Sequence, residues 1–175
     1  MWMLSRLSVI GSLVWIFGTY SLAPAALAGF SLFRMPVVDI PVSLAKGKVT
    51  TNEFGSKNNE TYSILIRAQR GRLPFADMNC MMGVTWGESS SFNCDREPLL
   101  KADWWVYDKG QCVAAGEAYE RGRGASSNHT LERYLGHFQG QAGHKYVLEI
   151  LFAADGSPLN VTIPHLVVEI NKPWD

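Results

Sequence analysis

The chain has 175 residues, of which 47% are hydrophobic and 18% are charged, and its 16 basic side chains balance 16 acidic ones. This composition is too apolar for a disordered chain, and it lacks the positive charge that drives nonspecific binding to nucleic acid. The length predicts one domain, and we expect no nucleic-acid partner.

The first 28 residues have the features of an export signal. Arg6 precedes an uncharged apolar stretch, and Ala26 and Ala28 provide the small residues that signal peptidase requires. We predict a signal peptide over residues 1–28, cleavage after Ala28, a short linker over 29–36 and a periplasmic or secreted mature chain. The alternative is an uncleaved inner-membrane signal anchor, because residues 7–28 could span a bilayer. We expect membrane contact only in that case.

The first strands are indicated by alternation of apolar and polar residues, which places every second side chain on one face. Residues 37–44 alternate in this way, and Pro41 marks them as an edge strand because proline cannot donate to a β-ladder. Residues 48–54 form a short candidate strand, and residues 61–68 repeat the alternation.

Five further candidate strands follow along the chain. Asp108-Lys109-Gly110 is typical of a hairpin turn between the strands 99–107 and 111–115. The remaining candidates are residues 131–138, 144–152 and 161–170. Short strands without long amphipathic helices predict an all-β fold, an immunoglobulin-like antiparallel β-sandwich of seven to eight strands. We expect it to be a single domain over residues 37–175.

Tyr146 lies near the start of a late strand, after Gly143, as in a tyrosine corner. In that motif the tyrosine hydroxyl contacts backbone a few residues upstream. An ordinary inward-facing tyrosine is the alternative.

Several strand patterns occur in the order seen in one bacterial family. They are the strand 38–44, the strand 60–66, the pattern Gly143-x-x-Tyr146-x-Leu148-x-Ile150 and the closing hydrophobic strand. With these features the chain resembles, over residues 37–170, the uncharacterised family catalogued as domain of unknown function 5625. The resemblance implies an exported, often envelope-tethered β-sandwich without an established activity or catalytic residues. This chain has no cysteine directly after the predicted cleavage site, which argues against a lipid anchor.

Three cysteines follow the leader, and an exported chain meets an oxidising compartment. Three pairings are possible. We favour a disulfide between Cys80 and Cys94, because both lie in one irregular segment, whereas Cys112 lies in a strand-like stretch. The spacing does not match a structural zinc site.

The segment 71–98 is the most informative part of the sequence for function. It is a long insert between two expected strands, and loops of this length tend to be functional. Its apolar side chains either form a small additional core or provide a binding surface. We expect Trp86 and Phe92 to be the partner contacts.

Two Arg-Gly-Arg tripeptides lie in expected loops and supply Arg70, Arg72, Arg121 and Arg123. If both lie at one end of the sandwich, they form a rim that attracts an anionic group or an acidic partner. Solvated loop charge is the simpler interpretation.

No nucleophile elbow, phosphate-binding loop, dinucleotide fingerprint or HExxH motif occurs. His137 and His144 flank an expected turn, but the spacing places no third metal ligand beside them, so we expect no metal site. Because the sequence has none of these motifs, we also expect no cofactor and no enzyme activity. The sequence therefore favours an exported binding protein in the bacterial envelope with a protein partner, for example a toxin-neutralising immunity protein. The alternative is a carbohydrate or envelope-glycan binding module in which Trp104 or Trp105 stacks on sugars together with Tyr107.

Overall fold

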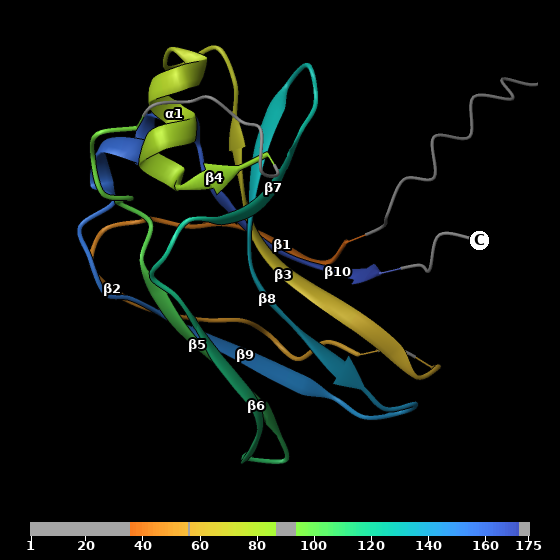
Figure 1. Cartoon of the computed structure of the whole chain (residues 1–175). Coiled ribbons are helices and arrows are strands. Elements are labelled where there is room, and N and C mark those ends of the chain that lie inside the picture. The colour runs from red at the N-terminus through yellow and green to blue at the C-terminus, as the bar shows by residue number, and fades with distance from the viewer. Residues whose placement is uncertain (1–35, 56, 87–93, 172–175) are drawn as a thin grey trace, which may run out of the picture. The chain divides into compact units, whose positions relative to one another are not determined.

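The computed structural model describes residues 36–55, 57–86 and 94–171, which form two packed β-sheets (Figure 1). Neighbouring strands are antiparallel except for one short parallel pair, β4 and β7. The predicted all-β sandwich is confirmed, but the described residues contain ten strands and not the expected seven or eight. The two strands missed from the sequence are β4 and β7. They are short, and β7 is glycine-rich, so neither has the alternation that predicts a strand.

The larger sheet has six strands in the order β1-β10-β3-β8-β7-β4. The strand that contains Pro41 lies at its edge, as predicted from the missing proline N–H. The six strands are β1 (Pro36–Pro41), β3 (Glu60–Gln69), β4 (Val84–Thr85), β7 (Gly122–Ser126), β8 (Thr130–Gly140) and β10 (His165–Asn171).

The smaller sheet has four strands in the order β2-β9-β5-β6. The β5–β6 hairpin turns at Lys109-Gly110, and both residues have positive φ, at 50° and 81°. Positive φ at both turn positions is the geometry of a type I′ turn, so the hairpin predicted from the sequence is confirmed. The four strands are β2 (Gly47–Thr50), β5 (Ala102–Asp108), β6 (Gln111–Ala118) and β9 (Tyr146–Phe152).

The core lies between the two sheets and is built from the alternating positions of each strand. Ile64 and Ile66 of β3 share one buried cluster with Leu148 and Ile150 of β9, and all four side chains are fully buried. Tyr146 lies in the same cluster, and its hydroxyl accepts a hydrogen bond from the backbone N–H of Gln141 at 2.7 Å. The tyrosine-corner contact is therefore confirmed.

Trp104 is the large aromatic side chain of β5 that faces the core, where it is only 5% exposed. A Cβ at Gly116 of β6 would lie 2.5 Å from the indole ring, and a Cβ at Gly136 of β8 would lie 2.3 Å from it. The indole therefore fits between the two sheets because two strands lack side chains where the ring lies. Its Nε1 donates a hydrogen bond to the Leu135 carbonyl at 3.2 Å, which satisfies its polar atom.

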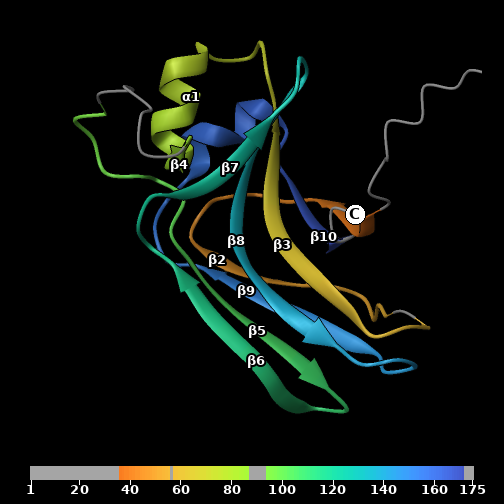
Figure 2. The ribbon, with the colours of Figure 1, turned by 45° about the vertical axis from the view of Figure 1, so that its right-hand side comes forward.

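One end of the sandwich carries two short helices, and the β5–β6 hairpin and the loop that connects β8 to β9 lie at the other end (Figures 1 and 2). The helix α1 (Phe75–Met82) belongs to the insert expected over 71–98, which therefore has secondary structure of its own. It ends at Gly83, whose φ of 70° gives the left-handed conformation that glycine adopts easily. The second is the 3-10 helix η1 (Ser157–Thr162).

The closing strand begins later than the predicted residue 161. The 3-10 helix occupies Ser157–Thr162, and Ile163 follows with a positive φ of 51°. Neither conformation continues a strand, so pairing begins only at His165. The apolar sequence of this segment does not reveal the 3-10 helix or the positive φ of Ile163, which together delay the start of the strand.

Candidate binding surfaces

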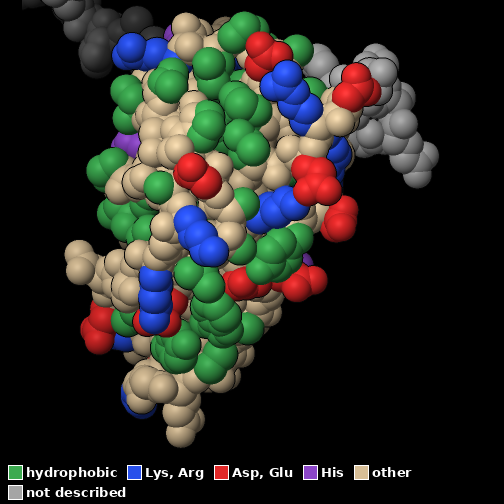
Figure 3. All heavy atoms as spheres, turned by 90° about the vertical axis from the view of Figure 1, so that its left-hand side faces the viewer, with side chains coloured by type: hydrophobic (Ala, Val, Ile, Leu, Met, Phe, Trp, Pro, Cys, Tyr) green, Lys and Arg blue, Asp and Glu red, His purple; other side chains and the backbone are tan. Residues whose placement is uncertain are grey.

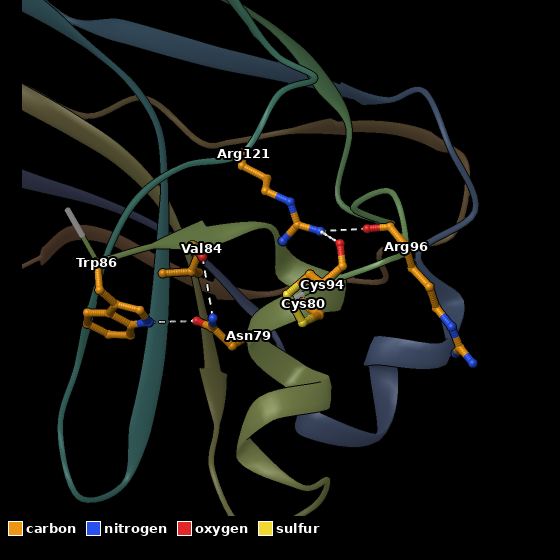
Figure 4. Close-up of a disulfide and its surroundings, with 7 residues drawn as sticks. All are labelled: Asn79, Cys80, Val84, Trp86, Cys94, Arg96 and Arg121. Atoms are coloured by element: carbon orange, nitrogen blue, oxygen red, sulfur yellow. Dashed lines mark hydrogen bonds between the residues drawn. A yellow bond between two sulfur atoms is a disulfide. The ribbon is translucent and has the colours of Figure 1, made fainter. Parts of the chain in front are cut away.

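The disulfide of the insert joins Cys80 of α1 to Cys94 (Figure 4). Their Cα atoms lie 5.5 Å apart, within the usual range for a disulfide, and the pairing favoured from the sequence is confirmed. Cys112 is a free, exposed cysteine on β6. The disulfide fixes the helix to the segment that returns to β5. We call the surface formed by residues 70–86, 94–99 and 121–123 the cap.

The cap packs onto the end of the sandwich core. Met78 and Met82 are fully buried in the core cluster, and Phe75, Met81 and Trp86 pack against it while remaining partly exposed. Of the two interpretations of the insert, the structure supports the one in which its apolar side chains extend the core. A binding surface on the cap must therefore consist of its partly exposed and charged side chains.

The indole N–H of Trp86 is hydrogen-bonded to the buried side-chain amide of Asn79. Asn79 is fully buried, its Oδ1 accepts from Trp86 Nε1 at 2.9 Å, and its Nδ2 donates to the Val84 carbonyl at 3.4 Å (Figure 4). The Trp86 ring also lies 6.3 Å from the Phe75 ring, centroid to centroid. Trp86 is thus a fixed, half-buried part of the cap. Phe92, the other predicted aromatic contact, lies outside the described residues.

The arginines of the two Arg-Gly-Arg tripeptides make different contacts within and around the cap. Arg121 Nη2 donates to the carbonyls of Cys94 and Arg96, at 3.2 and 2.6 Å (Figure 4). Arg70 donates to the Ser127 carbonyl at 2.6 Å and lies 4.3 Å from the centre of the Phe75 ring. Arg121 thus joins two segments of the cap, and Arg70 joins the cap to the loop between β7 and β8.

Arg72 and Arg123 are the exposed members of the two tripeptides. Among the described residues, neither they nor Arg70 and Arg121 form an ion pair with a carboxylate. Over its whole extent the cap carries five arginines against three acidic side chains. Its surface is therefore positively charged although the chain as a whole is neutral.

A cavity of about 590 Å³ opens beside the disulfide. Leu73, Met81, Leu99 and Pro158 supply the apolar part of its lining, and the charged residues of the lining are Arg96 and three carboxylates, Asp77, Asp95 and Glu97. A hollow of this size can receive one or two side chains of another molecule.

Asn79 and Arg133 were not singled out from the sequence, yet both position the cap. Arg133 is buried in β8, and its Nη2 donates to the Glu120 carbonyl at 2.5 Å, just before the second tripeptide. Burial lowers the pKa of Arg133 to about 10. No sequence signal marks these residues, because a buried asparagine or arginine looks like a surface residue until its partners are known.

The adjacent residues Trp104 and Trp105 point to opposite faces of β5, as strand alternation requires. Trp105 is half-buried on the outer face, where Tyr107 lies two residues further along the same strand. The sequence predicted that one tryptophan would face outward but could not say which one.

His144 does not pair with His137. Its Nδ1 lies 2.6 Å from Asp108 Oδ2. Within residues 36–55, 57–86 and 94–171 no group of three potential ligands is placed to hold a metal ion. The helices in these ranges are all too short or too polar to span a bilayer.

Comparison with known proteins gave a likeness of fold to a solved structure. No family model and no curated protein matches this chain. The crystal structure of GEBA250068378 from Sulfurospirillum deleyianum superposes with a TM-score of 0.58 at 13% sequence identity, over 77% of this chain and 97% of that one. At this identity the likeness concerns the fold alone.

Proposed function

We propose that this chain is an exported, non-enzymatic binding protein and that its cap recognises the acidic surface of another protein. The observation that carries this proposal is the arginine excess of the cap. The guanidinium groups of Arg70 and Arg121 bind carbonyls, and those of Arg72 and Arg123 extend from the surface, so none of the four charges is neutralised by a described carboxylate.

The Cys80–Cys94 disulfide supports export, because disulfides persist in oxidising compartments and are rare in the cytosol. It also holds the cap in one arrangement before a partner arrives, which lowers the entropic cost of association. The cavity beside it, whose lining is partly apolar and partly charged, offers a place for an anchoring side chain of the partner. A toxin-neutralising immunity protein is one form that such a binder takes, by analogy with other small exported sandwiches.

The test reverses the charges of the two exposed tripeptide arginines, Arg72 and Arg123. The double variant Arg72→Glu, Arg123→Glu is immobilised beside the unchanged protein, and each is used to capture proteins from the envelope fraction of the source organism. We expect the unchanged protein to retain one partner and the variant to retain at least about tenfold less of it, equivalent to about 1.4 kcal/mol. Capture by the unchanged protein is expected to decline as salt is added, because salt screens exposed charges.

The matched control is the double variant Lys57→Glu, Lys109→Glu, which makes the same change of charge at exposed positions away from the cap. It is expected to retain the partner as well as the unchanged protein does. If both variants lose the partner equally, or if the cap variant retains it, the cap is not the recognition surface.

A further inference from the structure

The outer face of the four-stranded sheet carries two half-buried aromatic side chains, Trp105 and Tyr107. Trp105 and Tyr107 are alternate residues of β5 and therefore lie on the same face, about 7 Å apart along the strand. The neighbouring strand β9 places Glu149 directly opposite Trp105 and Val147 directly opposite Tyr107. We call this surface the platform.

A shallow cavity of about 440 Å³ lies on the platform, within the size range of small-ligand sites. The Tyr107 ring and the Val147 side chain provide its apolar part. Two carboxylates, from Glu53 and Glu149, and two ammonium groups, from Lys109 and Lys145, provide the polar part. The cavity thus combines an aromatic surface with equal numbers of negative acceptors and positive donors.

Two polar pairs on this face of the sheet are held by ordered contacts. Lys48 of β2 forms an ion pair with Glu149 at 2.7 Å, and the hydroxyl of Tyr119 donates to Asp103 at 2.7 Å. The hydrogen bond to Asp103 raises the pKa of Tyr119. Side chains fixed in this way on a rigid sheet lose little further entropy when a ligand binds.

The chemistry of the platform indicates which class of ligand fits it. A protein interface is normally depleted of lysine and glutamate at its centre, whereas here a Lys48–Glu149 pair lies beside the two aromatic side chains. The balanced charges also give no preference for an acidic or a basic polymer. A sugar chain matches both features, since each ring has an apolar C–H face that can stack on an aromatic ring and hydroxyls at its edge that donate and accept. Hydrophobic side chains mixed with charges of both signs are visible on the side of the molecule shown in Figure 3.

We propose that the platform binds a neutral glycan chain. Trp105 and Tyr107 stack on successive sugar rings, and Glu53, Glu149 and Lys145 form hydrogen bonds with their hydroxyls. This site is separate from the cap, so the protein carries one surface for a glycan and another for a protein partner.

The experiment screens the folded protein against an array of neutral oligosaccharides that includes tetramers of N-acetylglucosamine and of glucose. The best ligand is then titrated while tryptophan fluorescence is recorded. We expect saturable binding that Trp105→Ala weakens at least about tenfold and that Trp105→Tyr largely preserves, because tyrosine retains a ring for stacking. Glu149→Gln is expected to weaken binding several-fold without unfolding the sheet, which circular dichroism checks.

Two controls separate this site from the cap. Trp86→Phe removes a tryptophan of the cap and is expected to leave glycan affinity unchanged, as is Arg72→Glu with Arg123→Glu. Conversely, Trp105→Ala is expected to leave capture of the protein partner unchanged. The proposal is overturned if no neutral glycan binds, if Trp105→Ala binds as well as the unchanged protein, or if Trp105→Ala abolishes capture of the protein partner.

Discussion

Replacing Trp104 by alanine is expected to lower the free energy of unfolding by about 3–5 kcal/mol, the usual cost of removing a large buried aromatic side chain. The ring bridges the two sheets, and two glycines on different strands leave the space that it fills. Its loss creates a cavity whose walls are fixed by strand pairing, and it leaves the Leu135 carbonyl without its hydrogen-bond donor. Chemical denaturation followed by circular dichroism measures the change.

The neighbouring Trp105 provides the matched control for this prediction. Trp105→Ala removes the same side chain from the same strand, but from its outer face, and is expected to cost about 1 kcal/mol or less. Trp104→Phe keeps most of the apolar volume and is expected to fall between the two. Equal losses for Trp104→Ala and Trp105→Ala would contradict the assignment of the two faces.

Removing the Cys80–Cys94 disulfide is expected to have the second large effect. The bridge spans a sequence separation of 14, and closing a loop of that length stabilises a protein by about 3 kcal/mol in the chain-entropy model. The double variant Cys80→Ser, Cys94→Ser should lose about this much stability, and a reductant should destabilise the unchanged protein to a similar extent. Denaturation curves with and without reductant measure both effects.

Cys112→Ser is the control for the disulfide, because Cys112 is exposed and unpaired. Its stability is expected to match that of the unchanged protein within about 0.5 kcal/mol. The stabilising role of the bridge would be disproved if the double variant unfolded at the same denaturant concentration as Cys112→Ser. It would also be disproved if reductant destabilised the double variant, which has no bridge to reduce.

Patterns that depend on neighbouring residues could be predicted from the sequence. Period-two alternation predicted the long strands, the presence of Pro41 predicted an edge strand, and the Lys109-Gly110 sequence predicted a hairpin turn. The same patterns did not find β4 or β7, because a two-residue strand and a glycine-rich strand depend on their partners in the sheet. The helix α1 was also missed, since a short helix in an irregular segment has little periodicity.

Contacts between distant residues could not be predicted. The choice between Trp104 and Trp105 as the inward-facing ring was left open by the sequence, because the space for the ring depends on Gly116 and Gly136, which lie on other strands. Likewise, Arg121 was expected only as a rim charge, whereas it also binds the carbonyls of Cys94 and Arg96. Long-range complementarity of this kind becomes visible only when the strands are placed side by side.

The same limit applies to the outer face of the six-stranded sheet. Arg67 of β3 lies 2.7 Å from Glu132 of β8, 3.5 Å from Asp39 of β1 and 3.7 Å from Glu169 of β10. Four strands from distant parts of the chain thus meet at one guanidinium group. In the sequence these residues are scattered single charges.

Both proposals place the ligand outside the cytoplasm, so location of the folded domain there is the claim on which the account depends. The most direct measurement is the intact mass of the protein isolated from source cells in the presence of an alkylating reagent. We predict a chain that begins at Gly29 and carries a single alkyl group, on Cys112, with Cys80 and Cys94 oxidised. A full-length chain with all three cysteines alkylated would show a reduced, unprocessed cytoplasmic protein and would contradict the account.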